Sequence, residues 1–218
     1  MILVFGGLTG GLGQPLHQAL CGLYEDKHVV MAIGRKNCNV ESEDSIAEFF
    51  GSLDAGLTIS SSLHIINATG VSISAMIHKT EVGDIGRMLR VNLVSNILML
   101  KHARELYKQH GGTFTMIGSV TAETGPIGTA AYSASKAALN GLCKVAAKEF
   151  ARLETRVNVI ELGYTLTGMI TQVPDFMKLR ERIPLNRLGH PLDVANACNF
   201  LIDCEYVTGA IVKVNGGL

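Results

Sequence analysis

The chain opens with a short apolar run, a cluster of glycines and an amphipathic segment, in that order. Ile2–Phe5 is apolar throughout, and glycines then recur between residues 6 and 13. Apolar residues follow at helical spacing over 12–24, and a second apolar run spans 29–33. A strand, a helix and a second strand in this order require a right-handed crossover, which makes the two strands parallel. This opening predicts an α/β fold.

The alternation of apolar runs with helical periodicity continues to the end of the chain. It predicts further helices over 42–50, 87–109, 132–153 and 191–203, and further strands over 63–66, 113–117, 156–162 and 210–214. No internal repeat or Pro/Ser-rich linker interrupts the pattern. We therefore expect one Rossmann-like domain over 1–218, with a doubly wound parallel sheet and helices on both faces. The segment around 165–185 has no strand pattern but several apolar positions, which suggests a substrate lid.

Composition excludes several classes of protein. Apolar residues make up 47% of the 218 and charged residues only 17%, which argues against disorder. The 19 basic and 19 acidic residues balance, so we expect no general attraction to nucleic acid or to a membrane. The five cysteines include no Cys-x-x-Cys pair and the seven histidines no ligand spacing, so we expect neither disulfides nor a metal site. No secretory signal or anchor pattern opens the sequence, and a cytoplasmic location is expected.

The glycine cluster is typical of a phosphate-binding turn. It lies between the first predicted strand and the first predicted helix, where a backbone without Cβ atoms lets a pyrophosphate approach the free N–H groups of the helix start. The candidate contacts are Gly7, Thr9, Gly11, Leu12 and Gly13. A plain tight turn would also explain the glycines, but their position favours a dinucleotide.

The residues after the second predicted strand indicate which dinucleotide binds. An acidic residue there would accept from the ribose 2′-OH, whereas a basic residue would pair with a 2′-phosphate. The strand is followed by Arg35 and Lys36, and no carboxylate occurs before Glu41. The sequence therefore favours NADP(H) over NAD(H).

Three polar residues form a candidate catalytic group. Tyr132 and Lys136 are four residues apart at the start of a predicted helix, so both lie on one helix face. Ser119 follows the strand predicted at 113–117, whose carboxyl end faces the expected cofactor crevice. This arrangement indicates proton transfer beside a bound dinucleotide.

With these motifs the chain resembles the short-chain dehydrogenase/reductase family over nearly its whole length. Gly6 stands where the family's glycine loop has threonine, and Asn92 matches the catalytic asparagine that accompanies Ser119, Tyr132 and Lys136. The resemblance implies further cofactor contacts. They come from an Asp-Val motif, an Asn-Asn-Ala-Gly motif and a Pro-Gly-x-x-x-Thr motif, and fall here on Asn39, Val40, Asn67, Ala68, Gly70, Gly163, Thr165 and Thr167, with Arg35, Tyr132 and Lys136 completing the set.

The resemblance also implies a reaction. Hydride would pass between the nicotinamide and a carbonyl or alcohol carbon, with Tyr132 as general acid and Ser119 holding the oxygen. Lys136 would lower the pKa of Tyr132 and bind the cofactor ribose, and Asn92 would position a water that relays protons to Lys136. The motifs over 187–195, 207–209 and 214–217 are most similar to β-ketoacyl-acyl-carrier-protein reductases. They imply NADPH-dependent reduction of a β-ketoacyl thioester or polyketide-type ketone to a secondary alcohol.

Two other functions stay open at this point. One is an alcohol, sterol or sugar dehydrogenase working in the oxidative direction, and the other is a dinucleotide sensor without turnover. Departures from the family motifs have local consequences. Leu162 replaces a proline and removes a φ constraint. Cys38-Asn39-Val40 follows so soon after Arg35 that we expect the helix normally found between the second and third strands to be almost absent and the adenosine end to be open.

Partner predictions follow from basic residues and from analogy. An acyl carrier protein would dock on basic side chains of the lid or of the helix predicted over 87–109. His110 and Leu153, however, stand where the related reductases would have basic residues that contact the carrier protein. The candidates are Lys178, Arg180 and Arg182, and Lys101, Arg104 and Lys108. The family analogy also predicts a homodimer or homotetramer.

Overall fold

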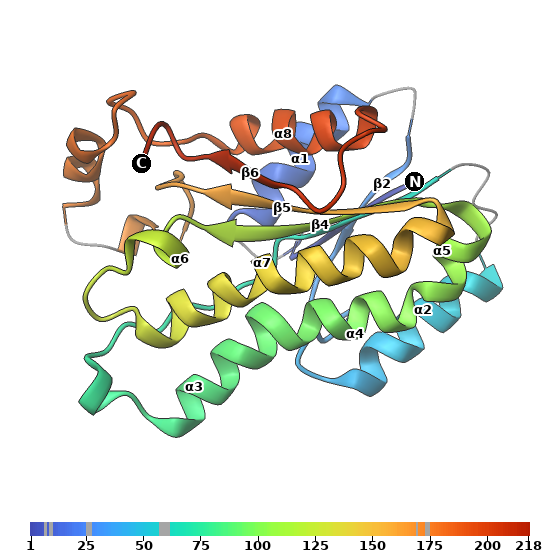
Figure 1. Cartoon of the computed structure of the whole chain (residues 1–218), viewed down its shortest axis with the longest axis horizontal. Coiled ribbons are helices and arrows are strands. Elements are labelled where there is room, and N and C mark those ends of the chain that lie inside the picture. Colours follow the sequence, from blue (N-terminus) through green and yellow to red (C-terminus); the bar gives the residue numbers. More distant parts are fainter. Residues whose placement is uncertain (7, 9–10, 25–27, 57–61, 169, 173–174) are drawn as a thin grey trace.

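Six strands form one parallel sheet in the computed structural model (Figure 1), which describes residues 1–6, 8, 11–24, 28–56, 62–168, 170–172 and 175–218. The strand order in space is β2-β1-β3-β4-β5-β6. Their bounds are Ile2–Phe5 (β1), Val30–Ile33 (β2), Leu63–Asn67 (β3), Gly112–Ser119 (β4), Thr155–Leu162 (β5) and Ile211–Val214 (β6). All neighbouring strands pair parallel, which confirms the predicted doubly wound α/β fold.

Helices cover both faces of the sheet, as predicted (Figure 1). On one face lie α1 (Gly13–Leu23) and α8 (Pro191–Asp203). On the other lie α2 (Glu43–Gly56), α4 (Ser95–His102), α5 (Arg104–His110) and α7 (Ala130–Phe150). Since both faces are covered, the central strands β1 and β3 are buried along their whole length; β1 is apolar throughout, and β3 is apolar except for His64 and Asn67.

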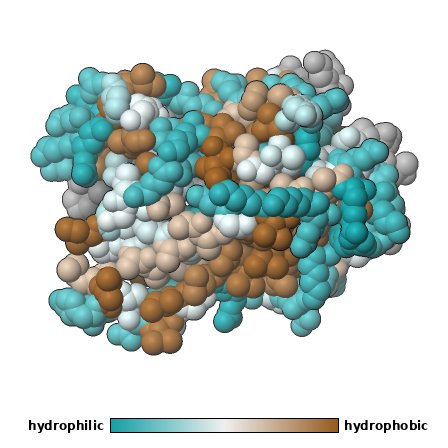
Figure 2. Space-filling view, in the orientation of Figure 1, coloured by the Kyte–Doolittle hydropathy of each residue, from teal (hydrophilic) through white to brown (hydrophobic). Residues whose placement is uncertain are grey.

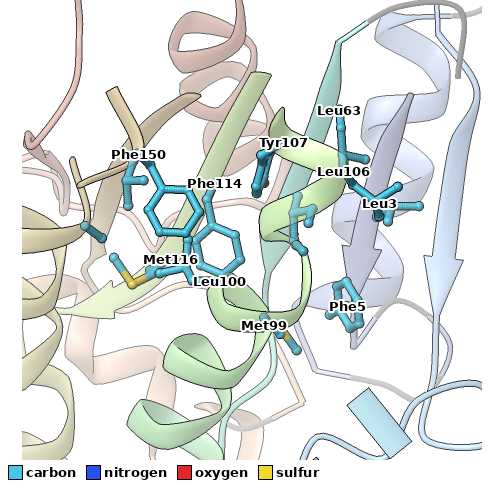
Figure 3. Packing of buried hydrophobic residues seen from close by; sticks show 14 of the residues in the cluster. Leu3, Phe5, Leu63, Met99, Leu100, Leu106, Tyr107, Phe114, Met116 and Phe150 are labelled. Carbon is cyan, nitrogen blue, oxygen red and sulfur yellow. The ribbon is translucent and has the colours of Figure 1, made fainter. Parts of the chain in front are cut away.

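Each face has its own hydrophobic cluster. In the larger one, Phe114 and Met116 of β4 pack with Phe150 of α7 and Leu100 of α4 (Figure 3). In the smaller one, β1, β4 and β5 pack against α1 and α8, with Leu16 and Cys198 fully buried. The two clusters fix the helices relative to the carboxyl ends of the strands, where the predicted site residues lie.

The helical region predicted over 87–109 starts earlier and is divided. The helix α3 (Val82–Leu89) passes through a π-helical turn, Arg90–Val94, into α4, and Ala103 separates α4 from α5. The turn carries Asn92, and π turns of this kind often occur at functional sites. The apolar periodicity predicts a helix in this region, but it does not reveal the extra residue of the π-helical turn, because the apolar positions on either side keep helical spacing.

The expectation that the helix between the second and third strands is almost absent is wrong, because α2 occupies this place after a short link from β2. A turn closes directly after β2, where the Asn37 and Cys38 amides donate to the Gly34 carbonyl at 2.9 and 3.0 Å. No helix stands between β2 and Asn39, and α2 begins at Glu43 and runs six residues beyond the predicted end at 50. This compact link brings residues 35–41 to the end of the sheet. Two shorter helices, α6 (Thr121–Thr124) and α3, complete the same end.

Within the described part of the chain, every helix is too short or too polar to cross a lipid bilayer.

Candidate active site

A cavity of about 560 Å³ lies at the carboxyl ends of the strands. Phe5, Ile33, Ile117 and Leu162, from four different strands, contribute to its wall. In doubly wound sheets ligands bind in the crevice at this end, where crossovers to the two faces diverge. The cavity is therefore where we place the predicted site residues.

The glycine turn forms one wall of this cavity through Gly6, Gly11 and Leu12. Gly6 has φ +84°, and a Cβ atom there would lie 3.3 Å from the Ala68 carbonyl oxygen. Leu12 is the N-cap of α1 and provides no side-chain cap, so the first N–H groups of the helix stay available for an anion. The predicted contacts Gly7 and Thr9 lie outside the described residues. Gly13 begins α1, is buried and does not line the cavity.

Ser119 and Tyr132 meet at the centre of the cavity wall. Ser119 ends β4 and Tyr132 stands in the first turn of α7, and both line the cavity close enough together for Ser119 to influence the pKa of Tyr132. Thr121 also donates to the Ser119 hydroxyl oxygen, from its amide at 3.3 Å and its hydroxyl at 2.9 Å. Burial raises the pKa of Tyr132, and the nearby Ser119 hydroxyl opposes that rise. The phenol is therefore held protonated and aimed beside a second hydroxyl.

Lys136 lies one helical turn after Tyr132 and is buried. Its ammonium donates to the Ile117 carbonyl at 2.7 Å and lies 5.9 Å from the centroid of the Tyr132 ring. Removal from water disfavours the charged form, and it lowers the pKa of Lys136 to about 8. A cation this near the phenol stabilises the phenolate more than the neutral phenol.

Asn92 is buried behind Lys136 and does not line the cavity. Its side chain pairs with the backbone of Val71 in both directions: Oδ1 accepts from the Val71 amide and Nδ2 donates to the Val71 carbonyl, each at 2.9 Å. A Cβ atom on Gly70 would lie 3.6 Å from both Asn92 Oδ1 and Lys136 Nζ. Asn92 therefore fixes the segment that follows β3, and its amide oxygen and the ammonium face one space above Gly70.

The segment after β3 contributes Ala68 and Gly70 to the cavity, but the predicted contact Asn67 points away from it. Asn67 is buried; its Nδ2 donates to Asn96 Oδ1 at 2.9 Å, and its Oδ1 accepts from the Thr69 amide at 3.1 Å. These bonds use the polar atoms of the Asn67 side chain inside the protein. Asn67 therefore supports the loop and does not meet the cavity.

The segment after β5 brings Gly163, Thr165 and Thr167 to the cavity. A Cβ atom on Gly163 would lie 2.7 Å from the Asn215 Cα atom, so only glycine fits between β5 and the chain that follows β6. Thr165 forms an isolated parallel bridge with Gly189. Leu162, which replaces the family's proline, remains inside β5 and pairs with both neighbouring strands.

The end of the cavity near β2 is charged. Arg35, Asn39 and Val40 line it, as do two residues that the sequence reasoning missed, Glu41 and Arg87. Glu41 lies 3.6 Å from the Arg35 guanidinium and 3.7 Å from that of Arg87. The Asn39 side chain accepts from the Glu41 amide at 3.3 Å, so it shapes its own turn.

Comparison with known proteins identifies the family. A family model described as enoyl-(acyl carrier protein) reductase matches residues 23–218. Carbonyl reductase family member 4 from Xenopus tropicalis is 36% identical over 230 residues, which cover 99% of this chain and 96% of that protein. The chain belongs to the short-chain dehydrogenase/reductase family. It is therefore an oxidoreductase of a family that uses nicotinamide dinucleotides.

Two further comparisons agree with this assignment. The human 3-oxoacyl-[acyl-carrier-protein] reductase is 34% identical over 183 residues, which cover 84% of this short-chain dehydrogenase/reductase and 76% of that enzyme. A solved structure from Agrobacterium tumefaciens, provisionally assigned as a gluconate dehydrogenase, superposes with a TM-score of 0.84 at 25% identity, covering 99% of this chain and 94% of that one.

The short-chain dehydrogenase/reductase cavity also contains residues that no sequence motif indicated. Arg87 comes from α3, and its only signal was a basic residue five positions before Asn92. Further additions line the same cavity: Ser72, Ser74, Thr121, Pro126, Thr129, Tyr164, Ile170 and Leu179. They come from loops or from short helical segments, where spacing along the sequence says little about position in space.

Proposed function

We propose that this enzyme reduces the carbonyl group of a β-ketoacyl thioester or a similar polyketide-type ketone to a secondary alcohol with NADPH. The observation that carries the proposal is that the Tyr132 and Ser119 side chains lie close together in the lining of one cavity, with the Lys136 ammonium 5.9 Å from the Tyr132 ring. One hydroxyl holds a carbonyl oxygen and the other supplies its proton. The names of the carbonyl reductase and 3-oxoacyl reductase relatives support the direction of reduction.

The residues present fit a nicotinamide dinucleotide. The uncapped start of α1 beside Gly11 suits a pyrophosphate, and Arg35 suits a 2′-phosphate. Gly163 and Thr165 lie beside the catalytic hydroxyls, where the nicotinamide would be held. Bound there, the cofactor supplies the hydride.

Proton transfer is the task of the chain's own residues. In reduction, Tyr132 Oη gives its proton to the developing alkoxide while the Ser119 hydroxyl donates to the same oxygen. Lys136 stabilises the phenolate that Tyr132 leaves behind. The space above Gly70, between Asn92 Oδ1 and Lys136 Nζ, suits a water that returns a proton through Lys136.

The substrate end of the cavity favours an uncharged group. The charged residues that line the described cavity are Arg35, Glu41, Arg87 and Lys136, and only Lys136 is near the catalytic hydroxyls. Pro126, Thr129, Ile170 and Leu179 are among the uncharged residues that line the cavity. A neutral ketone on an acyl chain matches this mixture of apolar and hydroxyl groups.

The segment 165–185 serves as the lid in this proposal. Its described part contains two 3-10 segments, Ile170–Gln172 and Phe176–Arg182, and each contributes one apolar side chain to the cavity, Ile170 and Leu179. Residues 169, 173 and 174 lie outside the described part. We treat residues 1–218 as one catalytic unit with this lid.

Of the two basic groups expected to dock a carrier protein, the one on the lid is the better candidate. Lys101 is paired with Glu43 at 2.6 Å, and Arg104 is paired with Glu105. On the lid, Lys178 is paired with Asp175 at 2.8 Å, whereas Arg180 and Arg182 are exposed and lie close in sequence to Leu179, which lines the cavity. Exchanging both for glutamate is expected to raise KM for a carrier-bound substrate and to leave KM for a free thioester unchanged.

The exposed face between α4 and α7 supports a homo-oligomer. Hydrophobic residues gather over these helices in Figure 2, and Ile97 and Val145 are 45% and 55% exposed. They line a groove of about 270 Å³ together with Leu100 and Leu142. A second copy of the chain would cover this face, and light scattering coupled to gel filtration tests for it.

A second candidate is oxidation of a sugar-type alcohol, which the likeness to the Agrobacterium structure favours. The deciding experiment follows nicotinamide absorbance with a β-ketoacyl thioester and NADPH, and with gluconate and either oxidised dinucleotide. Faster turnover of the thioester supports our proposal. Turnover of gluconate alone would replace it with the second candidate, and no turnover of either would remove both.

A further inference from the structure

Glu41 occupies the place between two arginines at the β2 end of the cavity. Its Oε1 lies 3.6 Å from Arg35 Nη2, and its Oε2 lies 3.7 Å from Arg87 Nε. The two cations come from different elements, one just after β2 and the other on α3. All three side chains line the same cavity, and the Glu41 carboxylate lies between the two positively charged arginines.

These ion pairs are loose. Both distances exceed a hydrogen bond, and the side chains of Arg35 and Arg87 are 65% and 47% exposed. Exposed pairs of this kind contribute little to stability. A better acceptor with more oxygens and more charge can therefore displace the carboxylate at small cost.

The backbone that carries these side chains is fixed more firmly than the ion pairs. The Glu41 amide donates to Asn39 Oδ1, and the Asn39 amide donates to Ser45 Oγ at 2.9 Å. On the opposite wall, buried Met88 anchors α3 next to Arg87. An incoming ligand therefore meets side chains that can adjust, carried on backbone segments that are held in place.

Charge identifies the ligand group. Two guanidinium groups and one carboxylate leave one net positive charge, and a phosphate monoester brings about −1.5 to −2 at neutral pH. We infer that Glu41 is an internal competitor for the cofactor's 2′-phosphate and that Arg87 is a second phosphate-binding residue beside Arg35. This inference rests on the proposed use of a dinucleotide by the enzyme. It makes the Glu41–Arg87 pair a determinant of the choice between NADPH and NADH.

The opposite role for Glu41 makes the inference testable. A carboxylate at this end of a dinucleotide site can instead accept from the ribose 2′-OH, which would favour NADH. Replacing Glu41 by glutamine keeps the size and removes the charge. If Glu41 competes with the 2′-phosphate, this variant changes the binding of a ligand that carries that phosphate. If Glu41 accepts from the ribose 2′-OH, the variant weakens the binding of a ligand that has the free hydroxyl.

The experiment measures binding of adenosine 2′,5′-bisphosphate and of 5′-AMP by calorimetry in a phosphate-free buffer, so that catalysis plays no part. Glu41→Gln is expected to tighten binding of the bisphosphate about fivefold to tenfold and to leave 5′-AMP unchanged. Arg87→Gln is expected to weaken the bisphosphate about tenfold, again without effect on 5′-AMP. Arg90→Gln, three residues further along and outside the cavity lining, is the matched control.

A double variant adds a second criterion. If Glu41 competes partly by neutralising Arg87, its removal improves bisphosphate binding less when Arg87 is already glutamine. Weaker binding of 5′-AMP by Glu41→Gln would overturn the inference in favour of ribose recognition. Unchanged binding of both probes in Glu41→Gln would overturn it without touching the proposed reaction. Failure of the unaltered enzyme to bind either probe would overturn both this inference and the cofactor assignment.

Discussion

The two ends of the cavity are built in opposite ways. At the catalytic end, Lys136 and Asn92 are buried, and they hold neighbouring groups through hydrogen bonds of 2.7 to 2.9 Å. At the β2 end, Arg35, Glu41 and Arg87 are partly exposed and separated by 3.6 to 3.7 Å. The same cavity thus joins a rigid, desolvated site to a solvated and adjustable one.

The difference teaches where each kind of interaction is useful. Burial shifts the pKa of Lys136 and Tyr132 and fixes their positions, which proton transfer requires. At the β2 end, solvent screens the charges of the arginines, so that an anionic group can bind and leave. Changes at the catalytic end should therefore alter the rate, whereas changes at the β2 end should alter the choice of cofactor.

The largest expected effect is the loss of the Tyr132 hydroxyl. Tyr132→Phe should lower kcat by about 10²–10⁴-fold, because the general acid is removed, with little change in the Kd for NADPH. Steady-state kinetics and fluorescence titration of NADPH measure the two quantities. Tyr206→Phe, at a fully exposed tyrosine, is the matched control. Near-normal kcat in Tyr132→Phe would contradict the assigned mechanism.

A rise in pH should impair the catalytic end of the cavity and leave phosphate binding at the β2 end unchanged. Burial lowers the pKa of Lys136 to about 8, so its ammonium form is lost above that pH. We expect kcat/KM for NADPH, which reports on the free enzyme, to fall about tenfold for each pH unit above 8. Binding of adenosine 2′,5′-bisphosphate should stay constant over the same range, because arginines keep their charge. Parallel losses in both measurements would refute the comparison.

The Arg35 side chain should matter for one cofactor only. Arg35→Ala is expected to raise KM for NADPH about fivefold to tenfold and KM for NADH by less than about twofold, since NADH lacks the 2′-phosphate. The effect is modest because the side chain is 65% exposed. Arg90→Ala controls for loss of a nearby positive charge. Equal increases for both cofactors would show that Arg35 does not contact the phosphate.

Ionic strength should produce the smallest difference between the two ends of the cavity, a small loss of NADPH affinity without a matching loss of kcat. Raising the salt concentration from about 0.05 M to about 0.5 M is expected to weaken NADPH binding a few-fold, because solvated charges are screened. The kcat at saturating NADPH should change little, since the catalytic groups are buried. Stopped-flow or titration data at several salt concentrations test this. A kcat that falls as steeply as the affinity would indicate that the catalytic end is open to solvent.

Much of the fold and site could be predicted because their signals are local. The apolar runs at β1 and β3 and the glycines after β1 predicted a parallel sheet with a turn at its carboxyl end. Tyr132 and Lys136 share one helix face because they are four residues apart. Their meeting with Ser119 depends only on the strand-to-helix order, which parallel topology fixes.

Other features depended on packing between distant segments. Asn67 carries a family motif, yet its polar atoms bond inside the protein to Asn96 and Thr69. The π turn at Asn92 is invisible to periodicity, because one extra residue leaves the apolar face intact. A motif thus predicts a position in the fold more reliably than the direction of its side chain.

By itself, the sequence determined the α/β architecture, the family motifs and the order of the catalytic residues, because spacing within one element sets which side chains share a face. Only the tertiary structure decided how Arg87 faces Glu41 across the cavity, 46 residues apart in the chain. That contact depends on where α3 lies relative to the end of β2, which the packing of whole helices against the sheet controls.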